Sequence, residues 1–361
     1  MKRALLAVTV LLAAATAQAQ SLDPHAHLKA YAAKVLPRCP GGTLTLEPLN
    51  SPGPANFNAY VVTLRSSDQY CGAQKYLLHS TKSQQVLLGS VIPLAKDQRP
   101  IATRVAEEAT RLIGKQLTAT VAPFPLADGL KAVAITRQTP YGQFAYNGFV
   151  DANDQYLIVG FRGTLSSDPA KALRESLGAA TAMRRGNAAA KVEVLEISDF
   201  QCPTCARAHE KLEPIIQQNL SKMNYVRIDL PLFEHHEWAI PAAMGARALQ
   251  KVAPAKYWSY VDYIFKNQEA IGKRKIDDVV QEWMSDNDVD WAAIAKIYNS
   301  KSERQALLDQ VSRAFAVGVA ATPTFVVNGQ ILGFGPDGTF TMDAIRRAVG
   351  AAPAAAAKPA K

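Results

Sequence analysis

The stretch from Val192 to Cys205 constrains this chain more than any other segment. It reads Val-Glu-Val-Leu-Glu-Ile-Ser-Asp-Phe-Gln-Cys-Pro-Thr-Cys. An apolar, β-prone run ends at Phe200, two cysteines follow with two residues between them, and an amphipathic run begins at once. The pattern predicts a strand that leads directly into a helix, with Cys202 at the first turn of that helix.

A cysteine at the start of a helix is suited to thiol chemistry. The thiolate is the attacking species, so a reactive cysteine needs its pKa lowered from about 8.5. Unpaired backbone N–H groups and the positive end of the helix dipole favour the anion, and Pro203 fits the first helical position because it has no N–H. Cys205 lies one turn further along. We therefore expect Cys202 to attack a disulfide and Cys205 to resolve the mixed disulfide.

Three other interpretations of the cysteine pair compete with thiol–disulfide chemistry. A zinc site needs four ligands, but Cys39 and Cys71 are well separated in the sequence, and His209 supplies at most a third ligand. Haem attachment needs a histidine directly after the second cysteine, where Ala206 stands. The pattern favours redox chemistry without a metal or cofactor, and leaves zinc or a purely structural disulfide as alternatives.

Residues 1–19 have the pattern of a signal peptide. Lys2 and Arg3 are followed by an apolar run from Ala4 to Ala15 and by the small residues of Ala17-Gln-Ala19. The run is too short to span a bilayer comfortably, and no later segment has about 18 consecutive apolar residues. We expect export to the periplasm, where disulfides form and persist.

The net charge of +9 over 361 residues falls to about +7 once Lys2 and Arg3 are removed. The basic residues are scattered rather than clustered with aromatic ones, so nucleic acid is not an expected partner.

The N-terminal half contains two similar sets of elements. Each set begins with a predicted helix, which spans Asp23–Leu36 in the first and Ile101–Leu117 in the second. The predicted strands are Asn58–Arg65, Gln74–His79 and Gln85–Leu94, then Leu130–Arg137, Gln143–Val150 and Gln155–Phe161. The offset stays close to 72 residues. We predict two tandem repeats of a helix plus an antiparallel sheet, at residues 20–98 and 99–165, although unrelated meanders can share such patterns.

Three further expectations complete this half and the tail. Cys39 and Cys71 are predicted to form a structural disulfide, worth about 3–4 kcal/mol by loop closure. Residues 166–190 are predicted to be a linker helix, with the helical pattern running from Pro169 to about Met183. Residues 351–361, rich in Ala, Pro and Lys, are predicted to be a disordered tail.

The C-terminal half predicts an α/β domain at residues 191–350. The cysteine helix is followed by a strand at 224–230, a helical stretch to Phe315 and a hairpin around Asn328-Gly329. A final helix is expected at 341–349. Strand, helix and strand, then helices, a hairpin and a helix, is a thioredoxin-like order with a helical insertion at about 235–315.

Three segments carry a resemblance to the DsbA-like thiol–disulfide oxidoreductases. They are Val194–Cys205, Pro231–Ala243 and Gly318-Val-Ala-Ala-Thr-Pro-Thr-Phe-Val-Val-Asn-Gly329. The resemblance implies an enzyme that exchanges disulfides with cysteine-containing folding proteins, as isomerase or oxidase. It also implies a membrane oxidase or reductase as redox partner.

The same resemblance implies roles for individual residues. Thr322–Pro323 would be cis and would pack against the cysteine pair. A cis bond exposes the preceding backbone for pairing with an extended substrate. Glu196, beneath the active site, would take the proton of Cys205; an outward-facing glutamate on a strand edge is the alternative. Asp199, His209, His235 and His236 are not expected to be catalysts.

Two features bear on the direction of electron flow. The residues between the cysteines, Pro203 and Thr204, shift the redox potential through thiolate stability, and Thr322 is like the isomerases rather than DsbA itself. The segment Gly148–Gly160 resembles a hairpin in the cystatin-like dimerisation domain of DsbC/DsbG-type isomerases. Two such units in one chain could pair with each other or extend a homodimer interface. A dimer favours isomerase work and a monomer favours oxidase work.

A function of another class stays open. The chain could be a binding or chaperone module whose cysteine pair is only structural or holds a metal.

Overall fold

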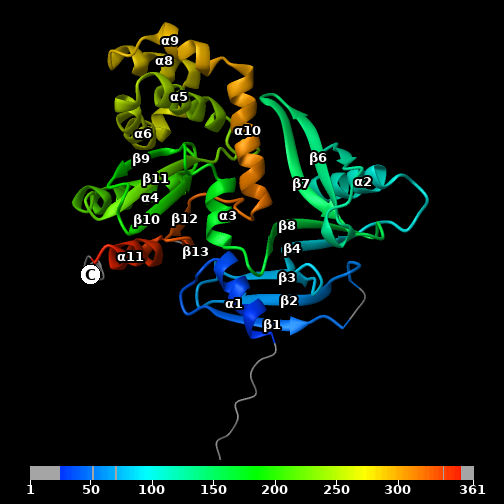
Figure 1. The fold of residues 1–361 in the computed structure, drawn as a ribbon. Coiled ribbons are helices and arrows are strands. Elements are labelled where there is room, and N and C mark those ends of the chain that lie inside the picture. Colours follow the sequence, from blue (N-terminus) through cyan, green and yellow to red (C-terminus); the bar gives the residue numbers. More distant parts are fainter. Residues whose placement is uncertain (1–24, 51–52, 70, 336, 351–361) are drawn as a thin grey trace, which may run out of the picture.

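The computed structural model describes residues 25–50, 53–69, 71–335 and 337–350. The predicted signal peptide and C-terminal tail lie outside the described residues. The chain forms two halves, a long antiparallel sheet and an α/β domain with a helical layer above it (Figure 1). The predicted α/β class, with an antiparallel sheet in the N-terminal half, is confirmed.

The N-terminal half is one sheet of eight strands in the order β1-β2-β3-β4-β8-β7-β6-β5. Its first repeat consists of α1 (Ala26–Val35), β1 (Thr43–Pro48), β2 (Asn58–Arg65), β3 (Ala73–His79) and β4 (Gln85–Pro93). The second consists of α2 (Ile101–Ile113), β5 (Thr118–Val121), β6 (Lys131–Thr139), β7 (Gly142–Val150) and β8 (Tyr156–Thr164). Each repeat therefore has one helix and four strands.

Sequence analysis missed the first strand of each repeat, β1 and β5. These strands form the two edges of the sheet, and their residues alternate only between exposed and partly buried. Because neither strand contributes a fully buried residue, neither shows the strong apolar pattern on which strand prediction depends.

The two repeats join through β4 and β8, which pair antiparallel from Gln85↔Thr164 to Pro93↔Tyr156. Gly89 and Gly160 face each other in the middle of this ladder. A Cβ atom on Gly89 would lie 2.1 Å from the carbonyl oxygen of Val159, so only glycine allows the two strands to approach this closely. The repeats of one chain thus pair with each other.

The C-terminal half is built on a five-stranded sheet in the order β13-β12-β10-β11-β9. Its elements outside the insertion are β9 (Met183–Gly186), β10 (Val192–Ser198), α4 (Pro203–Gln218), β11 (Met223–Asp229), β12 (Thr324–Val327), β13 (Gln330–Leu332) and α11 (Thr339–Ala348). The helices between β11 and β12 are α5 (Ala239–Val252), α6 (Tyr257–Lys266), α7 (Gln268–Ile271), α8 (Ile276–Asp286), α9 (Trp291–Tyr298) and α10 (Lys301–Ala316). β10 and β11 are parallel, whereas β12 runs antiparallel to β10.

The predicted linker helix at 166–190 is wrong in its second part. Helix α3 spans only Pro169–Ser176, begins after the N-cap Asp168, and is followed by the edge strand β9. Strand β9 pairs with β11, and Arg185 in β9 forms an ion pair with Glu213 and stacks 4.5 Å above the ring of Trp258. These tertiary contacts fix residues 183–186 as a strand, although their sequence is too polar and too short to indicate one.

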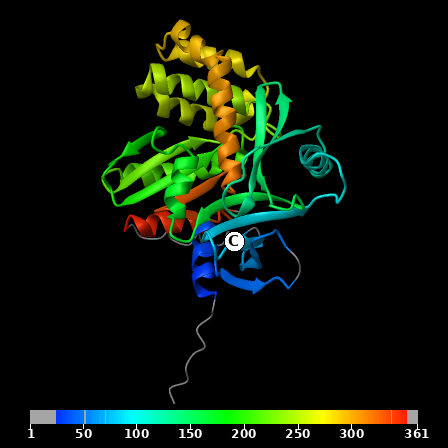
Figure 2. The same ribbon diagram turned by 45° about the vertical axis from the view of Figure 1, so that its right-hand side comes forward.

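The two halves pack against each other in several places, including along α10 and close to β13. Helix α10 lies along β7 in both ribbon views (Figures 1 and 2), where Asn147 donates to the hydroxyl of Ser312 at 3.0 Å. Close to β13, the N–H of Arg38 donates to the carbonyl of Ile331 at 2.8 Å, and the N–H of Gly333 donates to the carbonyl of Arg38 at 2.9 Å. Both repeats therefore hold the C-terminal half.

None of the helices in the described part of the chain combines the length and the apolar composition needed to cross a membrane.

Candidate redox site

Cys202 is the N-cap residue of α4, and Pro203 occupies the first helical position. Strand β10 ends at Ser198, and the buried Asp199 closes the turn that follows by accepting a hydrogen bond from the N–H of Gln201 at 2.8 Å. The carbonyl of Cys202 accepts from the N–H of Cys205 at 3.0 Å. Both thiols are free, and their residues are 7% and 0% exposed, respectively. The strand and the helix thus place two thiols side by side at the edge of the core.

The two thiols have opposite acidities. The hydrogen bond from the side chain of Cys205 lowers the pKa of Cys202 to about 6, with further help from the backbone of Cys205 and Thr204 and from the side chain of Thr322. Burial and the neighbouring Cys202 raise the pKa of Cys205 well above its usual range. At neutral pH the site therefore holds a thiolate at Cys202 and a thiol at Cys205.

The Thr322–Pro323 peptide bond is cis. It lies against the cysteine pair, since the carbonyl oxygen of Thr322 is 3.6 Å from Sγ of Cys202. The hydroxyl of Thr322 is buried and has no hydrogen-bond partner among the described residues. The structure therefore brings together Cys202, Cys205, Thr322 and Pro323, which the sequence placed about 120 residues apart.

Glu196 lies in the centre of the sheet and is 0% exposed, so the alternative of an outward-facing glutamate is wrong. Its carboxylate accepts from the hydroxyl of Tyr225 and from Arg227 at 3.2 Å. Arg227 also donates to Asp229 at 3.0 Å, and its guanidinium lies 4.5 Å from the ring centre of Phe200. Glu196 is thus paired with a cation, and it is not isolated among apolar groups.

Sequence reasoning missed Tyr225 and Arg227. Arg227 stands directly opposite Glu196 in the parallel pair β10–β11, and the one basic residue of this strand was the available signal. Because a buried charge needs a partner, an ion pair between charged residues of two neighbouring strands was a possible prediction.

Asp199 ties the active-site turn to the segment that leads into the helical insertion. Its carboxylate accepts from the N–H of Leu232 and from Nδ1 of His236, both at 2.7 Å. The hydrogen bond to Asp199 raises the pKa of His236. His236 is thus half-buried against the active-site turn, whereas His235 is exposed.

The comparisons with known proteins concern the same half of the chain. Residues 179–350 match the family model described as Thioredoxin. This half of the chain is a thioredoxin-like domain. The region that matches the family model begins at residue 179 and therefore includes β9. It starts before residue 191, the domain boundary that the sequence indicated.

Curated relatives of two kinds share sequence with the chain. The probable disulfide bond formation protein D of Bacillus cereus is 26% identical over 165 residues, which covers 44% of this chain and 74% of that protein. The Na(+)/H(+) antiporter NhaA 3 of Salinispora tropica is 29% identical over 149 residues, or 40% of this chain. The chain spans about a fifth of the length of that antiporter, with 21% of it covered.

Two solved structures similar to the chain come from Wolbachia pipientis and Proteus mirabilis. The thiol-disulfide exchange protein alpha-DsbA2 from Wolbachia pipientis has a TM-score of 0.42 and 15% identity, over 50% of this chain and 95% of that one. ScsC from Proteus mirabilis has a TM-score of 0.41 and 18% identity, over 51% of this chain and 82% of that one.

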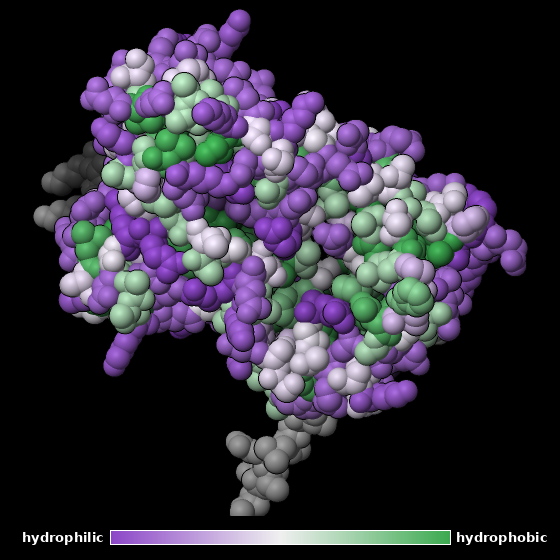
Figure 3. Space-filling model, turned by 45° about the horizontal axis from the view of Figure 1, so that its top comes forward, coloured by the Kyte–Doolittle hydropathy of each residue, from purple (hydrophilic) through white to green (hydrophobic). Residues whose placement is uncertain are grey.

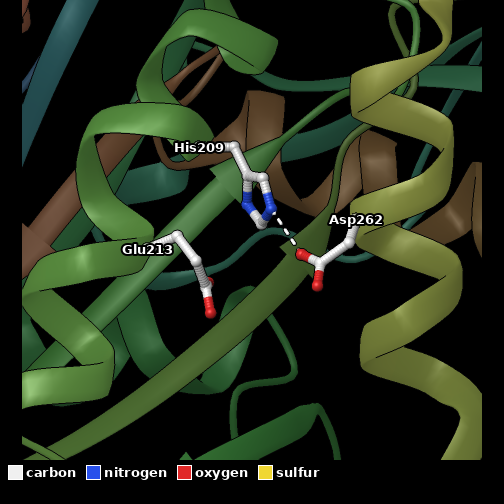
Figure 4. Close-up of side chains that lie close together, drawn as sticks. All are labelled: His209, Glu213 and Asp262. Carbon is white, nitrogen blue, oxygen red and sulfur yellow. Dashed lines mark hydrogen bonds and ion pairs between the residues drawn. The ribbon is translucent and has the colours of Figure 1, made fainter.

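One group of potential metal ligands occurs in the described part of the thioredoxin-like domain: His209, Glu213 and Asp262. Figure 4 shows His209 of α4 pointing to Asp262 of α6, whose carboxylate lies 2.7 Å from Nε2. Glu213 is already paired with the guanidinium of Arg185. The cluster joins two helices of the domain and includes neither cysteine.

Proposed function

We propose that this chain is an exported thiol–disulfide oxidoreductase that exchanges disulfides with folding proteins in the periplasm. The observation that carries the proposal is the unequal cysteine pair at the start of α4. The pKa of Cys202 is lowered to about 6 and the pKa of the buried Cys205 is raised. A nucleophile that is ionised at neutral pH, beside a thiol that keeps its proton, suits sequential thiol–disulfide exchange.

The proposed exchange balances without any further reagent. The thiolate of Cys202 attacks one sulfur of a substrate disulfide, a new S–S bond forms, and the other substrate sulfur leaves as a thiolate. Cys205 then loses its proton to the medium and attacks Sγ of Cys202. This second step releases the remaining substrate thiolate and leaves the Cys202–Cys205 disulfide. The substrate gains two electrons; oxidation of a reduced substrate is the same sequence in reverse.

The direction that we propose is oxidation of the substrate. A stabilised thiolate favours the reduced form of the pair, which makes the disulfide form a stronger oxidant. The name of the Bacillus relative, a probable disulfide bond formation protein, agrees with this direction. A membrane protein that re-oxidises the pair is the partner that such a cycle requires.

The joined repeats support a monomeric state. Strands β4 and β8 pair along nine residues within one chain, so neither strand is open to a second subunit. The isomerase version needs a homodimer and is the alternative. Sedimentation of the mature protein separates the two states.

The central test uses the mature chain, in which residue 20 is expected to be the first. Oxidation of a reduced two-cysteine peptide by the disulfide form should be lost in Cys202→Ser, and Cys205→Ser should accumulate the mixed disulfide. The non-redox alternative predicts that suppression of substrate aggregation persists in Cys202→Ser. Full oxidising activity in that variant refutes the redox proposal. Sequencing the N-terminus of the periplasmic protein tests export.

A further inference from the structure

Asp199 is the centre of a hydrogen-bond network around the redox pair. Its residue is 1% exposed, and its carboxylate accepts from Nδ1 of His236 and from the N–H of Leu232, both at 2.7 Å. The carbonyl of Asp199 accepts from the N–H of Cys202 at 3.2 Å, and its N–H donates to Sγ of Cys205 at 3.5 Å. One buried residue therefore connects both cysteines to the ring of His236.

The ring of His236 carries a positive charge in this network. The hydrogen bond to Asp199 raises the pKa of His236, and the charge of Cys202 raises it further, against the opposing effect of burial. Because electrostatic coupling is reciprocal, an imidazolium that is favoured by the thiolate also favours the thiolate. The protonated ring thus adds to the hydrogen bonds from Cys205, which lower the pKa of Cys202 most.

Two other cations lie near the redox pair, but neither has the same effect. Arg227 is fully buried, and two carboxylates already neutralise it. Arg207 donates to the hydroxyl of Thr204 at 2.9 Å, but it is exposed, so water and salt screen its charge. The side chain of His236 is only 19% exposed, and a buried carboxylate fixes its ring. The charge of His236 is therefore both placed and partly shielded from solvent.

The surroundings of the pair strengthen such an interaction. Thr204 and Thr322 line a cleft of about 810 Å³ between the thioredoxin-like domain and the long sheet. Figure 3 shows apolar side chains gathered where the surface is hollowed between the two halves. Among the described residues that line the cleft, the exposed Lys75 of β3 is the one with a charged side chain. Because charges interact more strongly in apolar surroundings than in water, the charge of His236 is only partly screened at Cys202.

We infer that His236 is a positioning residue of the redox pair: held on Asp199, its imidazolium stabilises the thiolate of Cys202 and makes the disulfide form a stronger oxidant. The inference rests on the proposed function and assigns a residue to it. The thiolate exists only in the reduced protein, so its stabilisation favours the reduced form over the disulfide form. As the pH rises through the raised pKa of His236, the ring loses its proton and this stabilisation fades.

The first test removes the charge and keeps the hydrogen bond, in the full mature chain. The side-chain amide in His236→Asn can donate to Asp199 in place of Nδ1, but it carries no charge. The control is His235→Asn, which replaces the neighbouring, exposed histidine. Since a partly screened ion pair changes an equilibrium constant only a few-fold, alkylation of Cys202 at about pH 5.5 should slow about threefold in His236→Asn. The equilibrium constant with glutathione should also change about threefold, which makes the reduction potential more negative by roughly 14 mV.

The second test needs only the wild-type chain. The pKa of His236, measured by NMR titration, should be higher in the reduced protein than in the disulfide form, because only the reduced form has the thiolate. A histidine with a purely structural role would titrate alike in both forms. The chain has six histidines, so the resonance of His236 is assigned by elimination, with variants that each replace one of the others.

The outcomes separate the inference from the proposed function. An unchanged alkylation rate in His236→Asn, an equal loss in His235→Asn, or the same pKa of His236 in both redox forms overturns the inference, although peptide oxidation by the wild-type chain still supports the redox proposal. If His236→Asn folds poorly, the comparison of the two redox forms decides alone. A wild-type disulfide form that fails to oxidise a reduced peptide overturns the proposed function, and the role of His236 with it.

Discussion

The acidity of Cys202 can be tested by removing one hydroxyl group. Thr322→Val keeps the size of the side chain and the backbone carbonyl beside Sγ, but it removes the side-chain hydroxyl, which helps to lower the pKa of Cys202. The hydrogen bonds from Cys205 remain in the variant. We therefore expect the pKa of Cys202 to rise from about 6 and to stay below the ordinary value.

The expected change in reduction potential follows from the fraction of Cys202 that is ionised. With a pKa of about 6, Cys202 is mostly ionised at neutral pH, which stabilises the reduced form by about 1.4 kcal/mol relative to an ordinary thiol. Because Cys202 keeps some contact with solvent, with 7% of the residue exposed, solvent screening reduces this to about 1 kcal/mol, or roughly 20 mV. The two hydrogen bonds from Cys205 contribute more than Thr322 does, so Thr322→Val should remove less than half of this stabilisation and make the reduction potential more negative by about 5–10 mV.

Two measurements check this expectation. The rate of alkylation of the reduced protein against pH gives the pKa of Cys202, and equilibrium with glutathione gives the reduction potential. The stabilisation of the reduced form should vanish as the pH falls through about 6, where Cys202 becomes protonated. Thr118→Val, on the distant edge strand β5, is the control. An inflection near 8.5 in the wild-type protein, or an unchanged inflection in Thr322→Val, refutes the reasoning.

Three other sets of substitutions test the contacts that stabilise the folded protein. Replacing Cys39 and Cys71 by alanine removes a disulfide with a sequence separation of 32 and should lower the free energy of unfolding by about 3–4 kcal/mol in urea titrations; a loss below about 1 kcal/mol would contradict this. Arg227→Met leaves the carboxylate of Glu196 buried without its cation and should cost about 3–5 kcal/mol, whereas the added change Glu196→Gln should recover part of that loss. His236→Gln should destabilise the protein most below about pH 6.5 and progressively less as the pH rises through the raised pKa of His236, since the hydrogen bond to its carboxylate partner favours the protonated ring.

The fold was predictable where the sequence pattern is local. Alternating apolar residues indicated the six inner strands of the long sheet, because each of them buries residues on at least one face. Strand β9 was not predictable in this way. Arg185 holds it through contacts with distant residues, such as the ion pair with Glu213 and the stacking on Trp258.

The residues of the redox site were likewise predictable only in part. Cys202 and Cys205 form a local motif, and the resemblance supplied Thr322 and Pro323. Tyr225 was not predictable as a neighbour of Glu196, because its hydroxyl reaches the carboxylate only through the pairing of β10 with β11. Sequence analysis thus identified the cysteine pair and the Thr322–Pro323 segment and missed the two partners of Glu196.

The joined repeats have a consequence for how the protein responds to dilution. In a homodimer, a surface formed across the subunit interface is lost when the protein concentration falls below the dissociation constant, because subunit association depends on concentration. Here the pairing of Ser90 with Val159 lies within one chain, and the connection between the repeats keeps the two strands at a high effective concentration. The peptide exchange rate per molecule should therefore stay constant when the protein is diluted a thousandfold. A rate that falls on dilution, together with a decrease in sedimentation coefficient, would mean that the active form needs a second chain, and the joined repeats would then not account for a monomeric state.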